Sequence, residues 1–218
     1  MILAIAFTDL EALIILTIAL IAVYFAGTYW KHRTLTDYAH WFQDNLSKNG
    51  KVKFASHGHA GLRIKYEGKN RNADLREMHF ALTLGARENL IYYPYTIFTH
   101  DHDRLTCWAL LHKTIPSNVK IMRQTDKKMI QISADTPRFS PVRLEALEEL
   151  GYVMYASDRD YARELAANAA LPTRLKATKE VEFIEFDRLA SQLHLVAKLR
   201  KESLPGVVDL LFALGDSA

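Results

Sequence analysis

The sequence predicts an α+β protein with an N-terminal transmembrane helix, then an antiparallel β-meander, followed by a small helix and strand layer. Residues 12–30 form an uncharged apolar run, the segment after residue 50 alternates between apolar and polar residues, and the last third mixes both periods. The composition is that of a folded chain, since 49% of the 218 residues are hydrophobic and 24% are charged.

The apolar run from Ala12 to Trp30 is the first element. As a helix it is long enough to cross the roughly 30 Å hydrocarbon core of a bilayer. A cleaved signal peptide is not favoured, because Asp9 and Glu11 precede the run and no Lys or Arg does. We therefore expect residues 1–33 to be a membrane anchor.

The flanks of this run predict its orientation. Lys31 and Arg33 follow it directly, whereas its leading side carries two acids. The excess of basic residues places the C-terminal side in the cytoplasm. The single cysteine, Cys107, agrees with a reducing compartment and is expected to be an inert core thiol. We predict a cell-membrane protein that crosses once and has a cytoplasmic domain.

The start of the run also has a second interpretation. Phe7 and Glu11, four residues apart at the head of an apolar helix, resemble the start of a mature type IV pilin. The resemblance covers about twenty-five residues and implies cleavage before Phe7, a long helix and a following β-sheet. The chain departs from the pilin pattern at Ala6, where a glycine is usual, and in a leader without basic residues.

Residues 34–50 predict a second helix or a continuation of the first. Leu35, Tyr38, Phe42 and Leu46 recur at helical spacing, and Asn49-Gly50 ends the pattern. This apolar face is expected to lie either on the domain's own sheet or in the headgroup zone of the bilayer.

From Lys51 onward the alternation predicts strands. A hairpin with one basic face covers residues 51–67 around the turn SHGHAG. Further strands are expected at 75–84, 89–98, 104–112, 119–124 and 128–134. Together with the helix before them, these strands make up a predicted unit at residues 34–136.

The C-terminal third predicts a separate α/β subdomain at residues 141–218, or an extension that packs as one domain with the sheet. The stretch TPRFSP is expected to be the linker before it. Helices are expected at 141–151, 158–171 and 203–215, and strands at 152–157, 180–187 and 192–199.

Two H-x-H pairs raise the question of a metal site. His57 and His59 lie in one predicted turn, and His100 and His102 in another. Counting a strand at 89–98 places these turns at opposite ends of a meander, on the order of 20 Å apart. Two ligands alone make a poor zinc site, so we interpret both pairs as polar hairpin turns and predict no metal.

No catalytic residue or cofactor is predicted, because nucleotide-binding, hydrolase and metalloprotease motifs are absent from the sequence. Residues 31–76 hold ten Lys or Arg against four Asp or Glu, beside the membrane. Candidate contacts with anionic lipid are Lys48, Lys51, Lys53, Arg63, Lys65, Lys69 and Arg71. Nucleic acid is not expected as a partner, because aromatic residues are not interleaved with these charges.

We therefore predict a membrane-anchored binding protein, a scaffold or accessory subunit of a membrane complex with an unidentified protein partner. The alternatives are a membrane-anchored enzyme whose residues converge only in the fold, with His79 or His194 among them, and a pilin-like secreted subunit.

Overall fold

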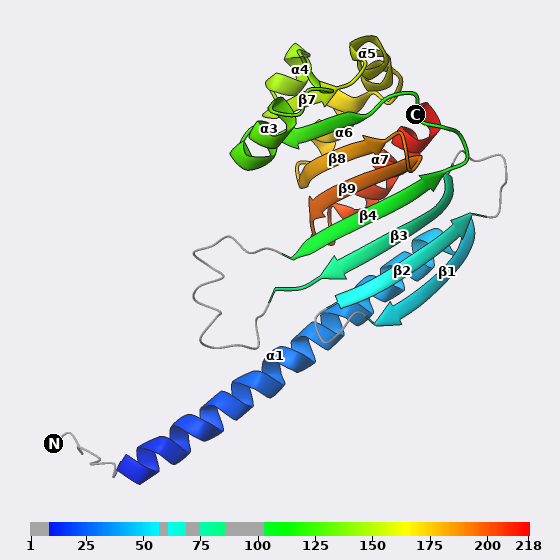
Figure 1. Ribbon diagram of the computed structural model, residues 1–218. Helices are drawn as coiled ribbons and strands as arrows, with labels where there is room; N and C mark the ends of the chain where they lie inside the picture. The colour runs from blue at the N-terminus through cyan, green and yellow to red at the C-terminus, as the bar shows by residue number, and fades with distance from the viewer. Residues whose placement is uncertain (1–8, 57–60, 69–74, 86–102) are drawn as a thin grey trace.

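A computed structural model describes residues 9–56, 61–68, 75–85 and 103–218 (Figure 1). Within these residues nine strands form one sheet in the order β1-β2-β3-β4-β9-β8-β5-β7-β6. The strands are β1 (Gly50–Ser56), β2 (Gly61–Gly68), β3 (Leu75–Thr83), β4 (Arg104–Leu111), β5 (Val119–Arg123), β6 (Ser140–Val142), β7 (Tyr152–Ala156), β8 (Val181–Asp187) and β9 (Gln192–Lys198).

The sheet confirms the predicted α+β class. Strands β1 to β4 form an antiparallel meander, and all the other described pairings are antiparallel as well. The order along the sheet then departs from the order along the chain, because β4 pairs with β9 and β5 lies between β8 and β7. Strands from the middle and from the last third of the sequence therefore alternate in one sheet.

Helix α1 (Asp9–Leu46) is a single element of 38 residues, which corresponds to a length of roughly 57 Å. The predicted second helix is thus a continuation of the first. Proline is absent from this stretch of sequence, and leucine, isoleucine and alanine dominate its first part. The helix ends in a short turn at residues 47–49, after which β1 runs back alongside it (Figure 1).

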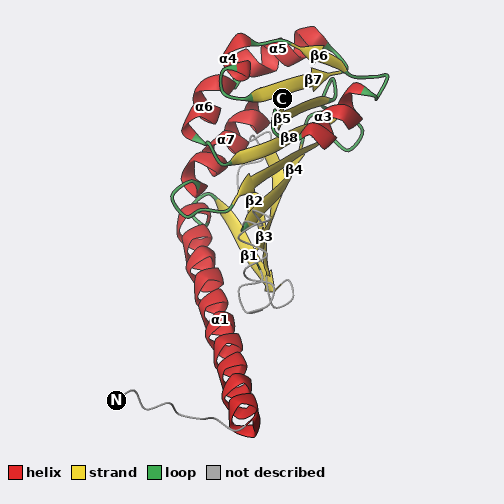
Figure 2. Cartoon of the chain, turned by 90° about the vertical axis from the view of Figure 1, so that its left-hand side faces the viewer, coloured by secondary structure: helices red, strands yellow, loops and turns green. Residues whose placement is uncertain are grey.

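The two parts of α1 differ in their surroundings. Every described side chain from Leu10 to Trp30 is exposed except Gly27, and this part projects away from the sheet (Figures 1 and 2). In the second part, Tyr38, Phe42 and Leu46 are buried in the hydrophobic core. Of the two predicted locations for this apolar face, the domain's own sheet is the correct one.

The remaining helices lie mainly on one face of the sheet. They are α3 (Lys127–Ala134), α4 (Glu145–Glu148), α5 (Arg159–Asn168), α6 (Leu171–Ala177) and α7 (Leu204–Ser217). Figure 2 shows α1, α4, α5, α6 and α7 on the same side of the sheet, with α3 on the other side. The core is formed between this helical layer and the side chains that the strands direct toward it, such as Phe80, Leu105 and Ile184.

The structure differs from the sequence-based expectation at residues 128–134 and in the predicted linker, and it does not describe residues 89–98. The strand expected at 128–134 is wrong, because these residues belong to helix α3, where the Asp126 carboxylate caps the first turn by accepting from the Met129 N–H at 3.1 Å. The last two residues of the predicted linker, Ser140 and Pro141, belong to strand β6, which pairs with β7. The strand expected at 89–98 lies outside the described residues.

Candidate functional site

The face of the sheet opposite α1 and α7 carries a row of chemically distinctive side chains. Alternation along each strand directs them away from the core. Neighbours in register across five adjacent strands are Lys53, Lys65, His79, Trp108 and His194. Cations and aromatic rings from strands far apart in sequence therefore lie side by side on one surface, which no described helix covers over β1 to β4 and β9 and which we call the open face.

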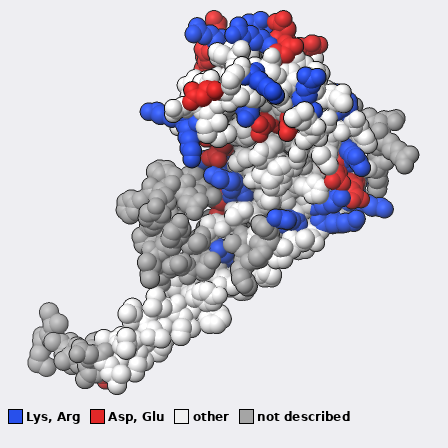
Figure 3. Space-filling model, in the orientation of Figure 1, with Lys and Arg blue, Asp and Glu red and all other residues white. Residues whose placement is uncertain are grey.

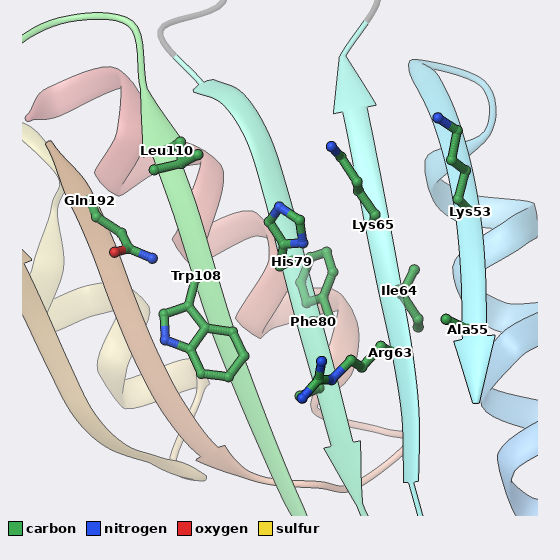
Figure 4. A pocket seen from close by; sticks show the side chains of 11 residues that line it. Lys53, Ala55, Arg63, Ile64, Lys65, His79, Phe80, Trp108, Leu110 and Gln192 are labelled. Atoms are coloured by element: carbon green, nitrogen blue, oxygen red, sulfur yellow. The ribbon is translucent and has the colours of Figure 1, made fainter. Parts of the chain in front are cut away.

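A hollow of about 590 Å³ lies in the open face over β1 to β4 and β9 (Figure 4). Its polar lining consists of Lys53, Arg63, Lys65, His79 and Gln192. Apolar lining comes from Trp108 and Leu110 on β4 and from two small residues, Ala55 and Ala81. Because the two alanines are small, the space above them stays open as the hollow, and the longer side chains on either side form its walls.

Two carboxylates organise the cations at one end of the hollow. The Lys65 Nζ lies 3.1 Å from Glu67 and 2.8 Å from Glu77, and the His79 Nε2 lies 2.8 Å from Glu77. The hydrogen bond from His79, followed by that from Lys65, lowers the pKa of Glu77 to about 2. The same contacts raise the pKa of Lys65, with the hydrogen bond to Glu77 as the largest cause. Glu77 is thus a carboxylate, and Lys65 a cation, at neutral pH.

Arg63 is placed differently from these paired cations. It is exposed, and its register neighbours on β1 and β3 are Ala55 and Ala81. Within the described part of the chain it makes no ion pair. Its guanidinium therefore borders the hollow with its hydrogen-bond donors unused by described acids.

Aromatic rings form the opposite wall. Trp108 stacks on His194 with ring centroids 5.5 Å apart and an interplanar angle of 2°, and Phe183 meets the same imidazole edge-on at 5.8 Å. Burial between these rings lowers the pKa of His194, although the charge of Glu185 opposes the effect. His194 is therefore neutral at pH 7, and Trp108 presents a flat apolar surface beside the cations.

The predicted lipid contacts divide into three groups. Lys51, Lys53, Arg63 and Lys65 alternate with core residues and share the open face. Lys48 lies in the turn between α1 and β1, and Lys69 and Arg71 lie outside the described residues. Sequence reasoning missed Trp108 as a member of the site. The alternation of β4 indicates that Trp108 faces away from Cys107, but only the register with β3 and β9 brings it to the cations.

The described strand ends that flank the two H-x-H pairs lie at the same end of the sheet and not at opposite ends, as the sequence had predicted. Thr83 is the register partner of both Gly61 and Arg104, so the described strand ends flanking residues 57–60 and 86–102 lie at the same end of the sheet. The prediction placed a further strand between the two strands that the structure pairs directly as β3 and β4. His57, His59, His100 and His102 themselves lie outside the described residues, and the described part holds no cluster of three metal-ligating side chains.

The chemistry of the hollow favours binding of an anion with an apolar part. Among the described lining residues, none is a serine, threonine, cysteine or carboxylic acid, and the titratable groups are the cations and His79. Cys107 belongs to the core, and its complete burial raises the pKa of the thiol. The lining supplies fixed positive charge and a stacking surface.

Known proteins provide no additional assignment for this site. A comparison of the chain with protein-family models and with curated proteins finds no match to either. The function is therefore inferred from the geometry of the chain itself.

Proposed function

We propose that this protein is a single-pass membrane-anchored binding protein, a scaffold or accessory subunit of a membrane complex, whose α+β domain lies in the cytoplasm. The observation that carries the proposal is the contrast between the two parts of α1. One part is bare and apolar, and the other is built into the core of the domain.

The bare part has the dimensions of a membrane span. From Leu10 to Trp30 the helix is roughly 31 Å long, close to the thickness of the hydrocarbon core. The most apolar stretch of this helix is not buried in the domain at all. The surface of the projecting helix is almost free of charge (Figure 3). Its large exposed side chains are Leu10, Leu13, Ile14, Ile15, Leu16, Ile18, Leu20, Ile21, Val23, Tyr24, Phe25, Tyr29 and Trp30. A patch of this size is stable only when lipid or another apolar partner covers it.

The residues around the span support a cytoplasmic domain. Glu11 precedes most of the apolar residues, whereas Lys31, His32 and Arg33 follow Trp30. Lys31 is only 4% exposed, and His32 and Arg33 are exposed where the helix enters the domain. This distribution of basic residues is the one that keeps the following segment on the cytoplasmic side.

Binding, rather than chemistry, fits the open face. Its hollow combines cations with an aromatic wall and lies on a rigid sheet, which is how proteins present a preformed recognition surface. The partner of the complex is expected to contact this face, since α1 and α7 already cover the other one (Figure 2).

A labelling experiment tests the anchor and its orientation together. Leu189 is 92% exposed in the turn between β8 and β9, so a Leu189→Cys variant offers a reactive thiol, while the buried Cys107 serves as the internal control. In intact cells a membrane-impermeant maleimide should leave the variant unlabelled, and permeabilisation should expose it. The protein should also remain in the membrane after alkaline carbonate extraction. Labelling in intact cells, or release by carbonate, contradicts the proposal.

A second experiment tests the binding role. Protein partners are captured from detergent extracts with the wild-type chain, with Trp108→Ala and with Ile132→Ala, which removes a side chain that is 48% exposed on α3. A partner of the open face should be lost with Trp108→Ala and kept with Ile132→Ala. Equal capture by all three chains argues against this face as the interface.

A pilin-like secreted subunit is the second candidate, because an uninterrupted α1 carries an antiparallel sheet, the arrangement that the resemblance at Phe7 and Glu11 implies. It predicts cleavage after Ala6 and an extracytoplasmic domain. The intact mass of the native protein distinguishes the two, since the membrane-anchored binding protein retains residues 1–6 and the pilin-like subunit lacks them.

A further inference from the structure

The geometry of α1 and β1 places one end of the sheet close to the end of the apolar span. Strand β1 runs back along α1 for roughly 20 Å from Gly50 to Ser56. The helix covers roughly 22 Å from Leu46 down to Lys31, the first residue after the span. By these two lengths, the Ser56 end of the sheet is level with Lys31. In a membrane-anchored chain this end, which we call the near end, lies at the headgroups.

On the open face, arginines and acids lie toward opposite ends of the strands. Arg104, in register with Thr83 and with Lys198, lies at this end, and Arg63 is only two residues into β2. The acids Glu67 and Glu77 are register partners at the other end of the same strands. On the open face, Arg63 and Arg104 therefore lie toward the near end, and Glu67 and Glu77 lie toward the other end.

The near end of the hollow has room for an oxyanion. Arg63 stands between Ala55 and Ala81, so no bulky side chain fills the space next to its guanidinium on either neighbouring strand. Lys53 and Lys65 are the next outward-facing residues along β1 and β2, and Figure 4 shows their side chains extending toward the opposite end of the hollow from Arg63. The planar guanidinium of Arg63, with open space beside it, matches the bidentate geometry of a phosphate.

The aromatic wall suits the apolar part of such a ligand. Trp108 of β4 lines the hollow, and its indole is partly exposed. Tryptophan is favoured where an apolar body meets the wet headgroup region. A ligand with a phosphate and an adjoining glycerol or acyl ester would contact both walls.

We propose that the hollow in the open face binds the phosphate of an anionic lipid headgroup, with Arg63 as the direct contact and with Lys53 and Lys65, which line the same hollow, adding positive charge at longer range. This inference rests on the proposed membrane anchor, because only anchoring brings the near end to the headgroups. It narrows the seven candidate basic residues to the three that line one hollow. Lys48, roughly 25 Å along the helix direction from Lys31, is not part of it.

The test uses the full chain in detergent micelles with equal amounts of phosphatidylglycerol and phosphatidylcholine of the same acyl chains. Native mass spectrometry gives the ratio of the two bound lipids. The wild type should prefer phosphatidylglycerol. Arg63→Gln should reduce that preference about fivefold, the effect of one basic group near an anionic headgroup. Arg63→Lys should reduce the preference less than Arg63→Gln, because it keeps the charge but loses the bidentate guanidinium. The matched control Lys48→Gln, with the same change of charge as Arg63→Gln, should retain all of the preference.

The possible results distinguish a failure of the proposed lipid site from a failure of the proposed membrane anchor. If the wild type and Arg63→Gln prefer phosphatidylglycerol equally, the proposed site is wrong. Carbonate extraction of the same variants tests the membrane anchor independently. Inorganic phosphate and glycerol 3-phosphate are added in a further arm. If they displace phosphatidylglycerol at matched concentration, the ligand is a soluble phosphate and the lipid assignment is wrong. Unchanged thermal unfolding of Arg63→Gln shows that a lost preference does not come from misfolding.

Discussion

Phe42 of α1 and Phe80 of β3 pack against each other in the core, with ring centroids 4.9 Å apart and both side chains almost fully excluded from solvent. This contact joins the helix that bears the apolar span to the middle of the meander. Because α1 is continuous from Asp9 to Leu46, one helix carries both the apolar span and the contacts with the sheet. In the proposed membrane-anchored chain, the orientation of the sheet relative to the bilayer therefore follows from the direction of this helix.

Removing the ring of Phe42 should weaken the domain. Phe42→Ala leaves a cavity between α1 and β3, and we expect it to lower the free energy of unfolding by about 3 to 5 kcal/mol. Thermal unfolding of the full chain in detergent measures the change. Phe25→Ala is the matched control, since the same side chain on the bare part of α1 is 66% exposed, and it should leave the transition in place. Equal effects of the two substitutions would contradict the packing described.

Gly50 begins β1 where the chain turns back from α1. A Cβ at this position would collide with the carbonyl oxygen of Glu67 and with the ring of Tyr66. Gly50→Ala should therefore destabilise the domain by about 1 to 3 kcal/mol, because backbone and a buried ring must shift. Denaturant unfolding in detergent measures the loss. The same substitution at Gly27, within the projecting part of α1, should cause no loss of domain stability.

The Glu77 carboxylate predicts a pH dependence of stability. Its folded pKa of about 2 lies below the ordinary value of 4.5, because His79 and Lys65 stabilise the charged form. The resulting stabilisation is fully present above pH 4.5 and is lost as the pH falls toward 2. Glu77→Gln should cost about 1 kcal/mol at pH 6, a value reduced by solvent screening at this surface site.

Unfolding curves at several pH values check this prediction. The difference between wild type and Glu77→Gln should shrink between pH 4.5 and pH 3. A difference that stays constant over this range would contradict the ion-pair account. Glu149→Gln, at an exposed carboxylate outside the described ion pairs, is the control for a general effect of charge.

Much of the fold follows from local periodicity. The apolar run, the helical spacing of Tyr38, Phe42 and Leu46, and the alternation in β1 to β4 each carry their own signal, so these elements are predictable to within a few residues. Residues 128–134 show where that signal fails. Isoleucine and methionine there resemble a strand, but the cap at Asp126 and local hydrogen bonds favour a helix.

The site is less predictable because it depends on pairing between distant strands. The basic residues of β1 and β2 are visible as one face of a hairpin, and these were predicted. Trp108, His79 and Gln192 join them only through the registers of β3, β4 and β9, which are separated by up to about a hundred residues of sequence. No local pattern encodes that β4 pairs with β9 rather than with β5.

The depth of the sheet relative to the bilayer tests the central claim most directly. A fluorophore is attached to Ser56→Cys at the near end or to Lys48→Cys at the far end, in vesicles that contain a headgroup-linked quencher. Cys107 is fully buried and stays unlabelled. We expect strong quenching at residue 56 and weak quenching at residue 48, which lies beyond the end of α1, itself roughly 22 Å from Lys31 along the helix. Equal quenching at the two positions would contradict a helix that crosses the membrane and holds the near end of the sheet against it.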